Sequence, residues 1–145
     1  MKKIILICLI IPFAFAAKAQ FKIVNSATIT LLELRPGNWP INLQRVTKES
    51  DTCYVLQFRD QEYANEVIMT TLRFRNLEQL KYFQKGLTAL KKGNNGDVAE
   101  YKDYTIKRVD IQKDGIWYIL NCGDGALTNF QQPEADKMIA AIVNL

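Results

Sequence analysis

The order of its hydrophobic patterns constrains the fold of this chain more than any other feature of the sequence. In residues 53–59 and 67–75, large apolar side chains alternate with a more mixed set that includes polar residues, which is typical of half-buried strands. A stripe of apolar residues with helical spacing follows, formed by Leu80, Phe83, Leu87 and Leu90. More extended stretches and a second helical stripe come after it. Because no crossover helix separates successive strands, this order predicts an α+β domain of mainly antiparallel sheet, with two amphipathic helices segregated to one face.

Extended segments are also expected before the first alternating stretch. Residues 21–35 and 41–47 are rich in strand-forming side chains and contain no helix cap. Between them, Arg35-Pro36-Gly37-Asn38 places proline and glycine where a type II turn prefers them. The chain is therefore predicted to reverse direction at this turn.

Two hairpin registers follow from the apolar rows. Pairing residues 53–59 with 67–75 so that Phe58 lies opposite Ile68, and Tyr54 opposite Leu72, keeps the large side chains on one face. In the second half, Asp114-Gly115 is a typical two-residue hairpin turn between residues 104–111 and 116–122. That turn predicts that Val109 lies opposite Leu120 and Ile111 opposite Tyr118.

Both helices have recognisable ends. Asn76 occupies an N-cap position with Gln79 three residues later, and Gly93 follows the last turn of the first helix. After a short extended segment that reaches Phe130, Pro133 opens the second helix. Its expected buried stripe consists of Ala135, Met138, Ile139, Ile142 and Val143.

The first nineteen residues predict export. Lys2 and Lys3 form a positive start, residues 4–16 are apolar, and Ala17-Lys18-Ala19 is a small-x-small cleavage pattern. The alternative is an uncleaved anchor, but the apolar run is shorter than the roughly 20 residues of a membrane span. We therefore expect residues 1–19 to be a signal peptide like those of Gram-negative bacteria. Residues 20–145 then form a single secreted or periplasmic domain without a stable membrane anchor.

Charge argues against a nucleic-acid partner. The chain has 19 Lys and Arg against 15 Asp and Glu, but three of the lysines leave with the signal, so 16 basic residues face 15 acidic ones. A net charge of +1 provides no broad positive field for a polyanion. A nucleic-acid-binding sheet that uses Arg59, Arg73 and Arg75 is the weaker alternative for this reason.

Few catalytic arrangements are available to this chain. It contains no histidine, which excludes serine-histidine and cysteine-histidine nucleophiles and histidine-ligated zinc. Carboxylates are the remaining route, and they gather at two probable turns: Asp60, Glu62 and Glu66 at one, and Asp110, Asp114 and Asp124 at the other. Two of them could form an acid/base pair, although solvated turn residues are the simpler interpretation. The sequence has no metal-binding, phosphate-binding or other cofactor motif.

Cys53 and Cys122 are the two cysteines of the exported part, and a disulfide between them is possible. The predicted hairpins put Cys53 on the face opposite Tyr54 and Leu56, whereas Cys122 shares the face of Leu120. A bridge therefore requires these two faces to meet, or a bulge in one strand. The alternatives are two separate thiols, or a reactive cysteine beside a positive group.

Apolar side chains also occur on the hairpin face that the helices are not expected to cover: Val55, Val67, Met69, Trp117 and Ile119. Either the N-terminal strands pack across this face, or it is an exposed patch for a partner or ligand. Trp39, in a turn between Asn38 and Pro40, is a second candidate contact. The candidate binding residues are therefore Trp39, Val67, Met69, Trp117 and Ile119.

Two functions from different classes fit this sequence. The first is an exported, soluble binding or interaction module without catalytic activity, whose partner is an unidentified protein or small ligand. The alternative is a small histidine-free hydrolase that acts on glycan or cell-wall material with Asp and Glu as acid and base. A pair of carboxylates buried together in a cleft would favour the hydrolase.

Cleavage before Gln20 is directly testable. Mass spectrometry of the exported protein should find a chain that begins at Gln20, with or without cyclisation to pyroglutamate, because the small-x-small pattern ends at Ala19. An intact Met1 terminus on the exported protein would contradict the assignment.

Overall fold

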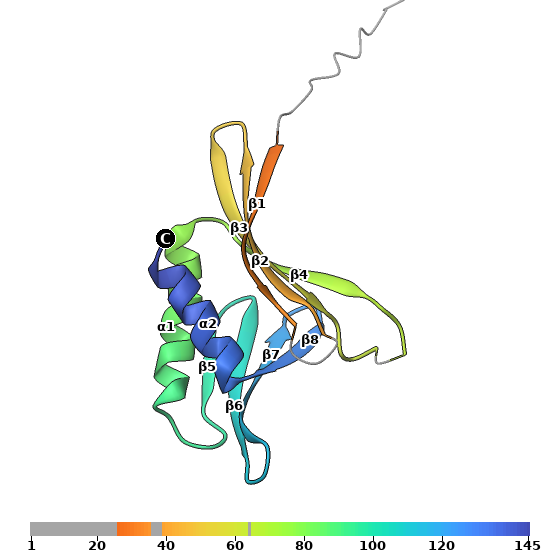
Figure 1. Cartoon of the computed structure of the whole chain (residues 1–145), viewed down its shortest axis with the longest axis vertical. Helices are drawn as coiled ribbons and strands as arrows, with labels where there is room; N and C mark the ends of the chain where they lie inside the picture. Colours follow the sequence, from red (N-terminus) through yellow and green to blue (C-terminus); the bar gives the residue numbers. More distant parts are fainter. Residues whose placement is uncertain (1–25, 36–38, 64) are drawn as a thin grey trace, which may run out of the picture.

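A computed structural model describes residues 26–35, 39–63 and 65–145, and these form two antiparallel four-stranded sheets and two helices (Figure 1). The first sheet has the order β1-β2-β3-β4, with strands Ser26–Leu34, Ile41–Lys48, Asp51–Arg59 and Met69–Phe74. The second has the order β5-β6-β7-β8, with strands Val98–Glu100, Tyr104–Ile111, Gly115–Cys122 and Leu127–Gln131. Helix α1 (Leu77–Lys91) follows β4, and α2 (Gln132–Val143) follows β8.

The predicted α+β class with mainly antiparallel sheet is confirmed. The expected signal peptide, the start of the first extended segment and most of the turn at 35–38 lie outside the described residues.

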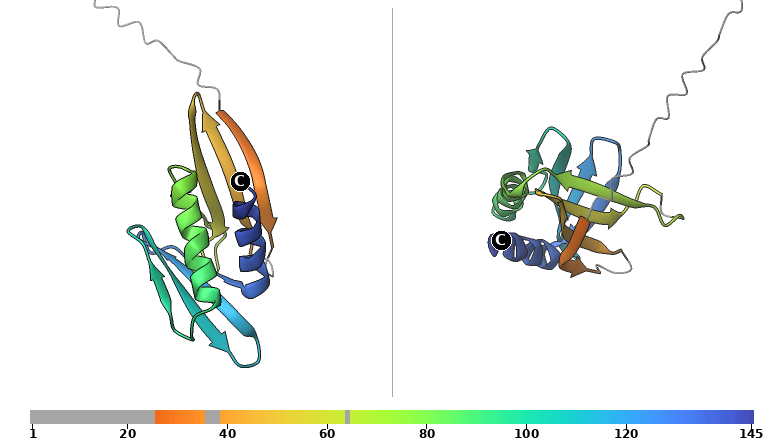
Figure 2. Two further views of the ribbon diagram at one scale, coloured as in Figure 1. Left: turned by 90° about the vertical axis from the view of Figure 1, so that its left-hand side faces the viewer. Right: turned by 90° about the horizontal axis from the view of Figure 1, so that it is seen from above.

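The two helices lie side by side and antiparallel on one side of the sheets (Figures 1 and 2). Side chains from both sheets and both helices form one buried core, in which Phe58, Leu80, Tyr118 and Met138 represent the four components. The opposite side of each sheet, which we call its outer face, is turned away from the helices.

The N-terminal strands extend the first sheet instead of covering its outer face. Strand β2 pairs edge to edge with both β1 and β3, so that Ile41 lies opposite Leu34 on one side and Phe58 on the other. The expectation that these strands pack across the hairpins is therefore wrong. Strand β2 has backbone groups on both edges to satisfy, and pairing with two strands satisfies them. The outer face of the first sheet consequently lacks a covering layer among the residues described.

The predicted register of the first hairpin is wrong by two residues, although the faces are right. Tyr54 pairs with Phe74, and Phe58 pairs with Thr70. A shift of two preserves the alternation, so the large side chains remain on the helix side. The connection between β3 and β4 is too long to be a tight turn, so the turn residues did not fix which residues pair.

The second hairpin differs more, because its loop is longer than predicted. Residues 112–114 form the turn, Asp114 N donates to Ile111 O at 3.0 Å, and Gly115 has a φ of +83°. This is a three-residue loop, and the glycine directly after it has a left-handed backbone conformation. The register moves by three, so Val109 pairs with Trp117 on the outer face and Arg108 turns toward the core. The predicted pairing of Val109 with Leu120 is wrong.

The first helix agrees with its sequence signals. Asn76 Oδ1 accepts a hydrogen bond from Gln79 N at 3.0 Å, and all four residues of the predicted stripe are buried. In the second helix Ala135, Met138 and Ile142 are buried, but Val143 is 62% exposed. Val143 is the last residue of α2 and lies one position after the buried Ile142, so it points to a different side of the helix.

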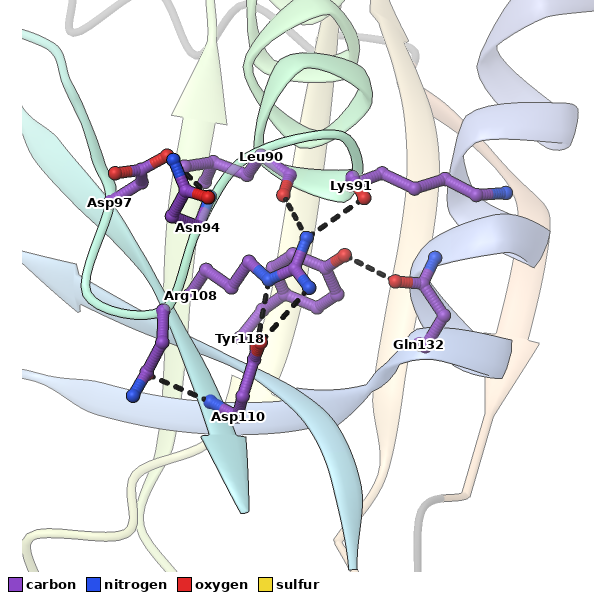
Figure 3. Close-up of polar contacts among 9 residues, drawn as sticks. Leu90, Lys91, Asn94, Asp97, Arg108, Asp110, Tyr118 and Gln132 are labelled. Carbon is purple, nitrogen blue, oxygen red and sulfur yellow. Dashed lines mark hydrogen bonds and ion pairs between the residues drawn. The ribbon is translucent and has the colours of Figure 1, made fainter. Parts of the chain in front are cut away.

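Arg108 connects the second sheet to the end of α1 (Figure 3). Its Nη1 donates to the carbonyl oxygens of Leu90 and Lys91 at 3.0 and 2.9 Å, and its Nε donates to Asp110 at 2.8 Å. The guanidinium thereby adds a charged donor to two carbonyls of the last helical turn, of which Leu90 O also accepts from Gly93 N at 3.0 Å. The hydrogen bond from Arg108 lowers the pKa of Asp110. Arg108 is therefore buried because its guanidinium caps the C-terminal end of α1 and pairs with Asp110.

Asp60 joins the two sheets at the end of β3. Its side chain is buried, and Oδ1 accepts from the backbone N–H groups of Glu62 and Leu127, each at 3.0 Å. Next to it, Gln61 N donates to Leu127 O at 2.7 Å. We call this set of contacts the sheet junction. The simpler sequence interpretation, that Asp60 is a solvated turn residue, is therefore wrong.

Substitution of Asp60 tests the sheet junction. Asp60→Ala removes the acceptor of two backbone N–H groups and should lower the free energy of unfolding by about 2–4 kcal/mol. Asp60→Asn keeps an oxygen in the same place and should lose less than about half as much. Urea denaturation of both variants gives the comparison. Equal stability of the two variants would show that Oδ1 does not hold the junction.

Candidate binding cleft

A cleft of about 560 Å³ lies beside the sheet junction. Its walls come from the segments next to the ends of β1, β2 and β3, from the second sheet and from the first turn of α2. Its lining residues are Arg35, Trp39, Gln61, Trp117, Asn129, Gln131 and Glu134. We call it the tryptophan cleft, because both tryptophans of the chain line it. Its volume falls within the roughly 300–1,000 Å³ of small-molecule sites.

Trp39 is held in place by Arg59. The chain enters β2 just after Trp39, and the guanidinium carbon of Arg59 on β3 lies 4.1 Å from the centre of the indole ring. Arg59 Nη2 also donates to Glu66 O at 3.3 Å, which helps to fix the guanidinium. A cation over an indole face contributes about 0.5–1 kcal/mol at a partly exposed site. The ring orientation is therefore set by the folded protein.

Trp117 reaches the cleft because of the register of the second hairpin. It lies on the outer face of β7, opposite Gln131 of β8, and Gln131 also lines the cleft. Trp117 Nε1 is buried, and no residue within the described ranges accepts its hydrogen bond. A buried donor of this kind costs stability unless water or a ligand pairs with it.

The polar wall consists of amides and one carboxylate. Gln61 Nε2 lies 3.4 Å from both Asn129 Oδ1 and Thr128 Oγ1, the long limit of a hydrogen bond. Glu134 Oε2 accepts from Gln131 N at 3.1 Å, as an acidic residue in the first turn of a helix often does. The wall therefore presents both donors and acceptors close to the two indoles.

The structure distributes the five predicted binding residues unevenly. Trp39 and Trp117, which are 78 positions apart in the sequence, line the same cleft. Ile119 lies opposite Asn129 and Met69 opposite Arg59, so each is one strand away from a cleft contact. Val67 is 74% exposed and precedes β4, outside the lining.

Sequence analysis missed the polar residues of the cleft. Asn129 and Gln131 alternate with the buried Thr128 and Phe130, and this period of two was the one available signal for an outward-facing polar pair. Gln61 and Glu134 carried no such signal. They reach the cleft only through the sheet junction and the start of α2.

A second hollow, of about 1,100 Å³, lies on the outer face of the first sheet. Val46, Cys53 and Val55 form its apolar part. Lys48, Arg73 and Arg75 line it together with Asp51 and Asp103, so two carboxylates offset two of its three positive charges. Arg59 instead contacts Trp39 at the other cleft, and the three arginines of the nucleic-acid alternative do not form one positive surface.

The two cysteines are free thiols in the structure, so the possible disulfide is not formed. Cys53 lines the hollow on the outer face of the first sheet, whereas Cys122 is buried on the helix side of the second. The faces that a bridge would need to join do not meet. Burial raises the pKa of the Cys122 thiol to about 11, and nearby Asp124 and Asp60 add to the effect.

Asp60 is the one buried carboxylate among the described acidic residues. Within residues 26–35, 39–63 and 65–145, no three His, Cys, Asp or Glu side chains are grouped so that they could hold a metal ion. The helices in these ranges are too short or too polar to cross a membrane.

Comparison with known protein families gives no match, and comparison with curated proteins gives no relative at a significant level of similarity.

Thiol labelling tests the placement of the cysteines. Denatured protein that spans residues 20–145, prepared without reductant, should contain two reactive thiols. In the folded protein Cys122 should react far more slowly than Cys53 at pH 8, because a pKa of about 11 leaves about 0.1% of the thiol ionised. Mass spectrometry of iodoacetamide adducts distinguishes the two sites. Loss of both thiols in the denatured sample would instead indicate a bridge.

Proposed function

We propose that this chain is an exported binding module without catalytic activity, and that the tryptophan cleft is its ligand site. The single observation that carries the proposal is the convergence of both tryptophans of the chain on one cleft, where the buried Trp117 Nε1 has no acceptor among the described residues. Apolar rings beside a few convergent polar groups are typical of small-ligand sites. An unpaired buried donor is retained at a cost to stability, which a binding role would explain.

The chemistry of the cleft favours binding over hydrolysis. Glycoside hydrolysis by carboxylates needs two of them on opposite sides of the scissile bond. Among the residues that the structure describes, Glu134 is the one carboxylate that lines the cleft, and Gln131 N already donates to it. Asp60 is close in the sequence to Gln61, but its Oδ1 is engaged in the sheet junction. The proposed ligand is therefore held and released unchanged.

The two tryptophans also provide the test. In ¹⁵N-labelled protein the two indole N–H resonances both report on the tryptophan cleft, since the chain has no third tryptophan. A screen of neutral, acidic and basic fragments should yield binders that shift both resonances. Binders that shift neither resonance, or a screen without binders, would contradict the proposal.

Trp117→Phe separates a binding role from a structural one. Because Trp117 Nε1 has no partner in the described structure, its removal breaks no hydrogen bond there. The variant should unfold within about 1 kcal/mol of the parent while its fragment affinity falls. The matched control is Tyr82→Ala, which truncates an exposed aromatic residue of α1 outside the cleft and should leave affinity unchanged. A stability loss with unaltered affinity would assign Trp117 a purely structural role.

A further inference from the structure

The charge around the tryptophan cleft is balanced. Arg35 forms an ion pair with Glu33 at 2.6 Å, and Arg59 and Glu134 add one charge of each sign. Such a cleft has little net field with which to attract an anion or a cation. Its occupant is therefore expected to be uncharged.

The hydrogen-bonding groups of the cleft match hydroxyl groups better than peptide groups. Glu134 can only accept, whereas Gln61 and Asn129 can both donate and accept. The 3.4 Å contact between these two amides is weak enough for a ligand to replace. A sugar hydroxyl donates and accepts at once, so it satisfies all of these groups.

The aromatic groups point to the same class of ligand. A pyranose ring is amphipathic, with C–H groups on its faces and hydroxyls around its edge, so it stacks on an indole while its edge remains hydrogen-bonded. Proline-rich peptides are the other uncharged ligands that tryptophan-lined grooves bind. Proline peptide units offer carbonyl acceptors and no donor, and they would leave the Glu134 carboxylate without a ligand partner.

We propose that the tryptophan cleft binds a neutral oligosaccharide, with sugar faces against Trp39 and Trp117 and hydroxyls at Gln61, Asn129 and Glu134. This inference rests on the proposed function, because it specifies the ligand class of the same cleft. The volume of about 560 Å³ is large enough for a short oligosaccharide.

Titration of ¹⁵N-labelled protein with short sugars tests the ligand class. The neutral panel comprises cellotriose, chitotriose, xylotriose, mannotriose and maltotriose, and the comparison ligands are trigalacturonate and hexaproline. At least one neutral trisaccharide should shift both indole N–H resonances. Its affinity should be unchanged between about 0.05 and 0.5 M NaCl, because screening affects only charged ligands.

Variants then assign the contacts. Trp39→Ala and Trp117→Phe should each weaken sugar binding by about fivefold or more, and Gln61→Leu should weaken it without disturbing the ring contacts. Tyr82→Ala should bind as the parent does. Circular dichroism of each variant confirms that the fold is retained.

The possible results distinguish the sugar assignment from the wider proposal that the cleft binds a ligand. Indole shifts with hexaproline or trigalacturonate alone would overturn the sugar assignment and leave the cleft as a ligand site. Sugar binding that shifts neither indole would place the sugar elsewhere and also overturn the inference. Absence of indole shifts with the neutral trisaccharides, trigalacturonate and hexaproline would overturn the inference. The proposed function itself would be contradicted only by a fragment screen without indole shifts.

Discussion

The arrangement of this domain depends on one buried carboxylate at the meeting point of its two sheets. Asp60 directly follows β3, and its Oδ1 accepts hydrogen bonds from the backbone N–H of Glu62 in its own turn and of Leu127 at the start of β8. Gln61 N adds a hydrogen bond to Leu127 O. An anion paired with backbone donors is worth more than a neutral acceptor, especially where water is excluded. The junction therefore sets how the sheets meet, and with it the position of Gln61 in the cleft.

The two sides of the sheets have different roles. On the helix side, apolar side chains fill the core, and Arg108 uses its charge to satisfy the carbonyls at the end of α1. Lys91 and Asp136 join the two helices at 2.7 Å, and this ion pair lowers the pKa of Asp136. On the outer side, Trp117 has a buried donor with no acceptor in the described structure. The buried cation of the core is thus fully engaged, whereas the unsatisfied donor belongs to a residue that lines the cleft.

Loop length decided which side chains face outward. The sequence Asp114-Gly115 is compatible with a two-residue turn, but the chain uses a three-residue loop with Gly115 at positive φ. This change of one residue in the loop, combined with the strand start at Gly115, places Val109 beside Trp117 and turns Arg108 inward. In the first hairpin the error was two residues and left the faces intact. An odd shift exchanges the faces of a strand, whereas an even shift does not.

The sequence by itself determined the elements that depend on local chemistry: the strand alternation, the capped first helix with its buried stripe, and the α+β class. It also drew attention to Trp39 and Trp117 as large rings outside the expected core. Only the tertiary structure decided that these rings share a cleft, that Asp60 is buried, and that β1 and β2 extend a sheet instead of covering one. The physical reason is the separation of the interacting residues along the chain. Caps and periodicity act over a few residues, whereas the cleft brings together residues as far apart as Arg35 and Glu134 through sheet pairing and a junction that no local pattern encodes.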